Sequence, residues 1–199
     1  MEGKPLPLSE PPVPTPSQTV GPFFHLGCTA AHAVSCLADS GAPGERLRLF
    51  CRVLDGDGVP VPDAMLELWQ ADATGKYHHP DDPQEKGADP RCQGFGRLGT
   101  DRDGICVFET VKPGRVPGNH GSLQAPHLSV SVFARGVLQR LATRIYFGGD
   151  PANAEDPILA LVPAQRRKSL LAVADSSRPT DWRFDIRLCG DGETVFFDV

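Results

Sequence analysis

The sequence has 199 residues, of which 40% are hydrophobic and 23% are charged, and this is enough for one domain with its own core. A net charge of −5 without a basic stripe excludes a protein that binds nucleic acid through its phosphates. No apolar stretch approaches the roughly 20 residues of a membrane span, and the first residues lack a secretion signal, so we expect a soluble cytoplasmic protein.

The amino-terminal residues 1–16 are rich in proline and lack periodicity, which predicts an extended arm rather than a helix or a central strand. The domain itself is then expected to cover residues 17–199. Its first segment contains Phe23 and Phe24, whose side chains a free tail would leave in water. We expect this segment to dock onto another surface, such as a partner subunit.

From Arg46 onward, apolar and polar residues alternate, which is the pattern of half-buried β-strands. The predicted meander turns at residues 55–58, 101–104, 136 and 190–192. Helices are expected only at residues 163–174, after a proline suited to a first turn, and in a short piece within residues 29–37. The sequence therefore predicts an all-β fold, a β-sandwich or barrel with long loops and one or two short helices.

Residues 75–96 form a loop that is long for a compact domain. Loops of this length are usually functional or disordered.

The six cysteines show neither a C-x-x-C pair nor the spacing of a zinc site. We expect them to be reduced and mostly buried.

Five separated segments resemble one family, the intradiol ring-cleaving dioxygenases. They are LELWQADATGKYHHP, FGRLGTDRDGICVFETVKPG, APHLSVSVFARG, RIYFGGDP and RFDIRL, in this order between Leu66 and Leu188. The arm segment PTPSQTVGPFFHLG and the carboxyl-terminal GETVFFDV extend the match to nearly the whole chain. The resemblance implies the β-sandwich core of this family, in agreement with the alternation described above.

Enzymes of this family hold a non-haem Fe(III) ion with two tyrosines and two histidines, because phenolates are hard anions that stabilise ferric iron. The resemblance matches the first tyrosine to Tyr77 and the first histidine to His127. Val116 stands in place of the second tyrosine and Ser129 in place of the second histidine. Valine has no donor atom, and a serine hydroxyl stays protonated near neutral pH. We therefore expect no metal site and no catalytic residue in this chain alone. The four ligand-equivalent positions are Tyr77, Val116, His127 and Ser129.

The arm and the carboxyl-terminal segment resemble those of an alpha-type subunit, which implies a homologous beta subunit as partner. That beta subunit would bind the Fe(III) cofactor, which prepares the ring of a bound catechol for attack by O2. The implied reaction is cleavage of an aromatic dihydroxybenzoate, 3,4-dihydroxybenzoate, by O2 to 3-carboxy-cis,cis-muconate.

Alpha-type subunits of this family contribute pocket walls at two places, and both have matching residues here. One is the arm at Thr19, Gly21 and Pro22, where glycine lets the backbone approach a ligand and proline fixes φ. The other is Arg135, whose planar fork can pair with the carboxylate of a benzoate. The resemblance implies that these residues bind substrate. The plainer alternatives are arm packing for Thr19 and a solvated turn for Arg135.

Two other interpretations remain open. In the first, the chain is a self-sufficient dioxygenase in which His78, His79 or His120 supplies the missing donors. In the second, it is a non-catalytic binding or transport β-sandwich. Separately, the plainer alternative for Tyr77 and His127 is that they hydrogen-bond to each other or to backbone in an iron-free pocket.

The remaining arginines have simpler expected roles. Arg144 and Arg183 lie within predicted strands, and we expect them to form structural ion pairs with Asp185 or Glu67. The basic run at residues 166–168 is expected to form the solvated face of a helix.

Overall fold

The computed structural model describes residues 16–21, 26–30 and 32–199. The strands of this part are β1 (Arg46–Leu54), β2 (Met65–Trp69), β3 (Phe95–Gly99), β4 (Ile105–Val111), β5 (Val116–Pro117), β6 (Leu123–Gln124), β7 (His127–Phe133), β8 (Leu141–Phe147), β9 (Leu171–Ala174) and β10 (Asp181–Arg187). The helical elements are η1 (Leu26–Ala30), η2 (Asn119–Gly121), η3 (Pro151–Glu155), α2 (Pro157–Leu161) and η4 (Arg167–Leu170). No helix of the described residues is long and apolar enough to cross a membrane.

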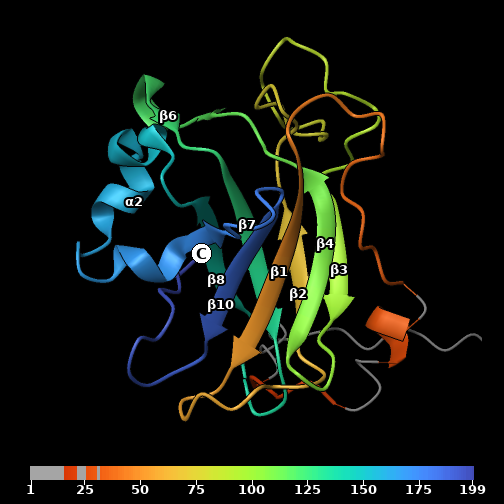
Figure 1. Cartoon of the computed structure of the whole chain (residues 1–199), viewed down its shortest axis with the longest axis vertical. Helices are drawn as coiled ribbons and strands as arrows, with labels where there is room; N and C mark the ends of the chain where they lie inside the picture. Colours follow the sequence, from red (N-terminus) through yellow and green to blue (C-terminus); the bar gives the residue numbers. More distant parts are fainter. Residues whose placement is uncertain (1–15, 22–25, 31) are drawn as a thin grey trace, which may run out of the picture.

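The main strands form two four-stranded layers that pack face to face (Figure 1). One layer has the order β3-β2-β7-β8 and the other β9-β10-β1-β4, and a parallel pairing of β8 with β9 joins them. On the open side, Val34 pairs with Arg97 of β3, and Cys36 pairs with Glu109 of β4. The all-β prediction is confirmed, as a sandwich that residues 34–36 close almost to a barrel.

The core lies between the two layers and follows from the alternation in the sequence. In β1, Leu47, Leu49, Cys51 and Val53 are buried, whereas Arg46, Arg48, Phe50 and Arg52 are half-exposed on the outer face. Successive side chains of a strand point to opposite faces, so one face of β1 enters the core. Full burial of an aliphatic side chain contributes about 1.5–3 kcal/mol.

Strand pairing differs from the predicted meander. Of the predicted turns, the one at Gly136 does join two paired strands, β7 and β8. However, β1 pairs with β10 and β4 instead of β2, and β3 pairs with β2 instead of β4. The turns at 55–58 and 101–104 therefore carry the chain between the layers. Beyond β10, the chain turns at residues 190–193 as predicted, and the N–H of Thr194 donates to the carbonyl oxygen of Arg187 at the end of β10. Phe197 then bridges to Ala142 of β8 instead of extending the pairing with β10. Alternation defines the buried face of a strand but not its neighbour.

The predicted helix at residues 163–174 is wrong. Residues 167–170 form a 3-10 turn, and residues 171–174 form β9. The short α-helix begins earlier, at Pro157, because the carboxylate of Asp156 accepts hydrogen bonds from the N–H groups of Ile158 and Leu159. Of the second predicted helix, residues 29 and 30 belong to η1, and the bridging residues 34–36 are not helical.

The cysteines carry free thiols. Cys51, Cys92 and Cys106 are buried, whereas Cys36 and Cys189 are exposed. The prediction of mostly buried thiols therefore holds for only half of them.

Gly96 of β3 packs tightly against the closing segment and β4. A Cβ atom added at Gly96 would lie 2.6 Å from Leu37 Cδ1 and 2.9 Å from Phe108 Cδ1. We predict that Gly96→Ala lowers the free energy of unfolding by about 1–3 kcal/mol, because the overpacked side chains must move. Urea unfolding measures this change. Gly41→Ala is the matched control, since its Cβ would meet no atom closer than 3.9 Å. Equal stability of the two variants would contradict the prediction.

Candidate functional site

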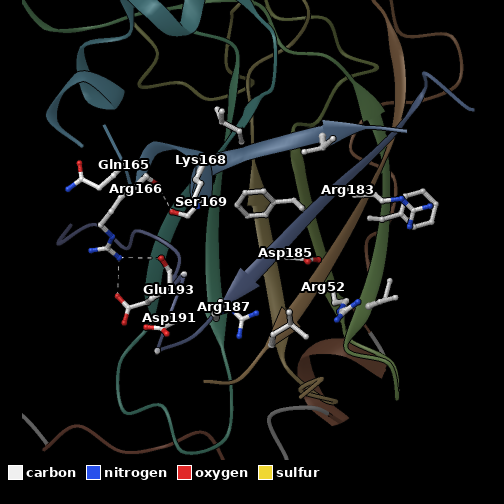
Figure 2. A pocket seen from close by; sticks show the side chains of 18 residues that line it. Arg52, Gln165, Arg166, Lys168, Ser169, Arg183, Asp185, Arg187, Asp191 and Glu193 are labelled. Carbon is white, nitrogen blue, oxygen red and sulfur yellow. Dashed lines mark hydrogen bonds and ion pairs between the residues drawn. The ribbon is translucent and has the colours of Figure 1, made fainter. Parts of the chain in front are cut away.

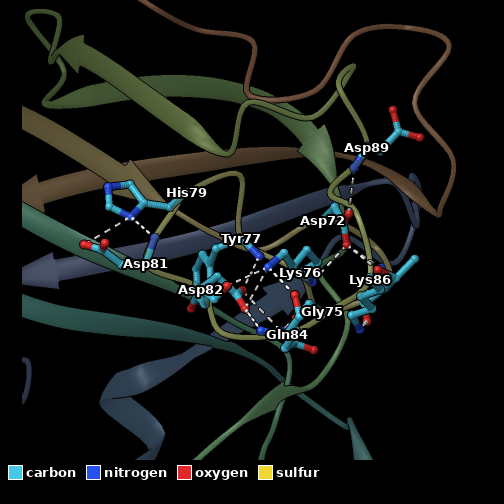
Figure 3. Close-up of polar contacts among 11 residues, drawn as sticks. Asp72, Gly75, Lys76, Tyr77, His79, Asp81, Asp82, Gln84, Lys86 and Asp89 are labelled. Atoms are coloured by element: carbon cyan, nitrogen blue, oxygen red, sulfur yellow. Dashed lines mark hydrogen bonds and ion pairs between the residues drawn. The ribbon is translucent and has the colours of Figure 1, made fainter.

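Tyr77 lies in the long loop that follows β2, and a network of polar contacts orders this loop (Figure 3). The carboxylate of Asp72 accepts hydrogen bonds from the N–H groups of Thr74, Lys76 and Asp89. The amine of Lys76 lies 3.1 Å from Asp82 Oδ1 and donates to the carbonyl oxygens of Asp82 and Gln84. A loop without regular structure is thus fixed by charge-assisted hydrogen bonds.

Asp82 connects this network to Tyr77. Its Oδ2 accepts a hydrogen bond of 2.9 Å from the N–H of Tyr77. Burial would raise the pKa of Asp82, but the hydrogen bonds that it accepts outweigh burial and lower the pKa to about 2. Asp82 is therefore ionised at neutral pH and holds the backbone of Tyr77 in place.

The Tyr77 ring stacks on Trp69, with ring centroids 6.0 Å apart and planes 6° apart. Burial raises the pKa of the Tyr77 phenol, so at neutral pH the ring carries its proton. The three histidines that could have served as substitute iron donors lie at the surface. His78 is exposed, His79 is exposed with its ring edge toward Trp69, and His120 is exposed in a left-handed turn with φ 56°.

His127 opens β7 and is buried, with 3% of its surface exposed. Its Nδ1 lies 2.8 Å from the carbonyl oxygen of Ala125. Burial, and then the positive charge of Arg144, lower the pKa of His127 to about 4, so the imidazole is neutral. Its ring packs near Tyr146 at a centroid distance of 5.7 Å. His127 therefore hydrogen-bonds to the backbone, which is one of the two partners expected for it.

The sequence did not predict that Arg144 lies beside the ligand-equivalent positions. It lies on β8 directly opposite Ser129 of β7. Its Nη1 donates to Gln124 Oε1 at 2.6 Å and to the hydroxyl of Tyr146 at 3.4 Å. The expected ion pair with Asp185 or Glu67 is wrong, since Glu67 pairs with another arginine of the same layer, Arg97, at 2.5 Å. Arg183 likewise pairs with Asp175 rather than with either expected partner.

The four ligand-equivalent positions surround this guanidinium. Ser129 of β7 is the register partner of Arg144 on the neighbouring strand β8. Buried Val116 pairs with Gln124, the residue that Arg144 binds. The charge of Arg144 adds to the lowering of the His127 pKa by burial, and it partly offsets the raising of the Tyr77 pKa by burial. A fixed cation beside only one phenol and one imidazole does not fit a ferric ion. In addition, no group of three His, Cys, Asp or Glu side chains suited to a metal occurs among the described residues.

Asp156 supports the same region from behind. Its Oδ2 accepts a hydrogen bond from the N–H of Ala125, and its Oδ1 accepts one from the hydroxyl of Tyr146. The carboxylate thereby links the segment before His127 to Tyr146, the ring that His127 packs against. The Asp156-Pro157 pair at a helix start was the available sequence signal for this residue.

The predicted substrate-binding residues gather at a second place. Thr19 Oγ1 accepts a hydrogen bond of 2.7 Å from the N–H of Gly136. The neighbouring Arg135 is exposed and lies with Nε 3.0 Å from Asp63 Oδ2. Gly21 is exposed, and Pro22 lies outside the described residues. We call Thr19, Asp63, Arg135 and Gly136 the Arg135 cluster.

The Arg135 cluster and the ligand-equivalent positions lie at opposite ends of β7. In Figure 1, the loop after β2 and β6 lie at the top, and the turn between β7 and β8 lies at the bottom. The seven residues of β7 alone span about 20 Å. This length far exceeds a benzoate ring, so Arg135 cannot hold the carboxylate of a ring bound beside His127 of the same chain.

Known proteins share this fold. The family model described as Dioxygenase matches residues 19–190. The chain therefore belongs to the intradiol ring-cleaving dioxygenases, as its motifs predicted.

Its similarity is high to one subunit type within that family. It is 44% identical to the protocatechuate 3,4-dioxygenase alpha chain of Burkholderia cepacia, over 93% of this chain and 97% of the relative. It is 42% identical to the alpha chain of the same name from Pseudomonas putida, over 92% and 96%. The beta chain of the Burkholderia cepacia enzyme is 39% identical, over 78% and 69%.

A solved structure shows the same fold. The dioxygenase domain of a carbohydrate-binding fusion protein from Streptomyces sp. SirexAA-E superposes with a TM-score of 0.60 at 26% identity. The match covers 88% of this chain and 99% of that domain.

Restoring the missing donors tests the role assigned to Arg144. We predict that the variant Val116→Tyr/Ser129→His still binds little Fe(III), because the guanidinium repels a trivalent cation at short range. Adding Arg144→Gln to these two substitutions is expected to allow iron binding, measured as metal content and as a phenolate-to-iron absorption band. Arg144→Gln alone is the control and should bind none. Stoichiometric iron in the double variant with Arg144 intact would contradict the prediction.

Proposed function

We propose that this chain is the alpha subunit of a heteromeric protocatechuate 3,4-dioxygenase and that a homologous beta subunit holds the Fe(III) ion. When bound there, the ion would supply the oxygen chemistry of ring cleavage. This chain would supply part of the pocket wall and recognition of the substrate carboxylate. The proposal is supported by the similarity to alpha chains of that name, and by the existence of a related beta chain in Burkholderia cepacia.

The separation of the two places along β7 carries the proposal. A carboxylate anchor at Arg135 must lie one benzoate length from the reacting carbons, whereas the ligand-equivalent positions of the same chain lie about 20 Å away. The anchor is therefore useful only to a pocket centred on another chain. The poor fit of the ligand-equivalent positions to iron points to the same division of labour.

The Arg135 cluster is suited to that task. Arg135 is a permanent cation whose side chain is 70% exposed, so it can reach beyond its own subunit. Its present partner Asp63 sits at φ 60° on an adjacent turn and holds the guanidinium by a contact at Nε, which leaves its two terminal nitrogens available for a carboxylate. Thr19 joins the arm to the same turn, so arm and anchor would move as one unit.

Purifying this chain alone and with a beta-type partner tests the assignment. We expect the isolated chain to lack iron and dioxygenase activity, because it offers two of four donors. The co-purified complex is expected to contain iron and to cleave 3,4-dihydroxybenzoate, measured by O2 consumption. An isolated chain that is ferric and active would overturn the proposal and favour the self-sufficient enzyme.

A substitution within the complex tests the anchor itself. We predict that Arg135→Ala raises the KM for 3,4-dihydroxybenzoate about 10- to 150-fold, the loss expected for one charge-assisted pair of about 1.5–3 kcal/mol. Catechol, which lacks the carboxylate, should be turned over by the variant and the wild type with equal KM. Arg140→Ala, in the same exposed turn, is the matched control and should change neither value. An equal loss for both substrates would show that Arg135 acts structurally instead.

A further inference from the structure

The outer face of the layer β9-β10-β1-β4 carries a groove of about 930 Å³ (Figure 2). Its lining includes none of the ligand-equivalent positions and no residue of the Arg135 cluster. Its floor is formed by outward-facing residues of β1 and β10, in the registered pairs Phe50–Arg183 and Arg52–Asp185. The turn η4 and the segment at residues 190–193 form one wall. The face is amphipathic, since Phe50 and the 65% exposed Val173 lie among charged side chains.

The groove is positively charged on a negatively charged protein. Five cationic side chains line it against three anionic ones, whereas the whole chain carries −5. Within the described part of the chain, the side chains of Arg52, Lys168 and Arg187 make no hydrogen bond or ion pair, while the side chain of Arg166 is paired with Glu193. The unpaired cations attract an anionic ligand, and the charge of the remaining surface does not compete for it.

Arg52 lies on the floor of the groove and is half-buried. The chain itself covers its Nε, which has no hydrogen-bond partner among the described residues. A carboxylate laid across the floor would meet the charge of the Arg52 guanidinium, and it would also reach toward Arg187, two residues beyond Asp185 on the same face of β10.

The dimensions suit an extended peptide. Crossing the four strands β9, β10, β1 and β4 takes roughly 14 Å, the length of four or five extended residues. Every second side chain of such a segment faces the groove, so two or three side chains, carboxylates or apolar groups, would contact it. A second copy of this chain is disfavoured, because a two-fold contact through this face would set cations against cations.

We propose that this groove binds an acidic, extended segment of the partner beta-type subunit. The inference rests on the proposed function for the identity of the partner, and on the unpaired cations and exposed apolar residues for the chemistry of the segment. The groove would thus be an assembly contact separate from the Arg135 cluster, positioned by β1 and β10 rather than by β7. Complementary charge at such a contact mainly sets partner choice and association rate.

Site-specific photo-crosslinking in the co-purified complex tests the groove. Benzoylphenylalanine placed at Val173 should crosslink to a peptide of the beta-type subunit that contains at least two Asp or Glu residues, identified by mass spectrometry. The same probe at Leu161, which is 79% exposed and outside the groove, is the matched control and should not capture that peptide. The variant Lys168→Glu/Arg187→Glu should weaken the complex about tenfold or more, whereas Arg102→Glu, exposed and outside the groove, should not.

The outcomes separate the two proposals. A wild-type complex that forms and turns over, with no crosslink from Val173, overturns the groove assignment and leaves the proposed function standing. The same holds for a crosslink to a segment without acidic residues, to another copy of this chain, or to residues 1–15. Failure of the wild-type chains to form any complex overturns both.

Discussion

The guanidinium of Arg144 is the fixed charge that sets the hydrogen bonding and the electrostatics around the ligand-equivalent positions. It lies among the four ligand-equivalent positions, opposite Ser129 and hydrogen-bonded to Gln124 and Tyr146. Burial, and then this fixed positive charge, lower the pKa of His127 to about 4 and keep its imidazole neutral. Hydrogen bonds of Arg144, Tyr146 and Asp156 hold the region together as a polar cluster.

Strand β7 separates two groups of residues along its length. It begins at His127 and ends two residues before Arg135, so one rigid element separates the ligand-equivalent positions from the Arg135 cluster. The loop that carries Tyr77 is held by Asp72, Lys76 and Asp82, and it remains ordered although the ligand set is incomplete. The family fold is therefore preserved, while the Arg135 cluster and the proposed groove lie on its end and its outer face.

Local sequence patterns predicted local structure well and long-range pairing poorly. The alternation in β7 and β8 and the glycine between them identified a hairpin, because both partners lie within one short stretch of chain. The neighbours of β1 are β10 and β4, and nothing in the residues of β1 indicates them. The helix predicted at residues 163–174 failed because tertiary pairing with β8 and β10 draws residues 171–174 into a strand.

The sequence by itself determined the family and the all-β class, because these are properties of residue type and order along the chain. Only the tertiary structure decided that Arg144 lies opposite Ser129 and binds Gln124. It also decided that Thr19 hydrogen-bonds to Gly136, and that Arg52 and Lys168 line one groove. These contacts join residues far apart in sequence. Which of them meet depends on strand order and register, and alternation alone leaves both undetermined.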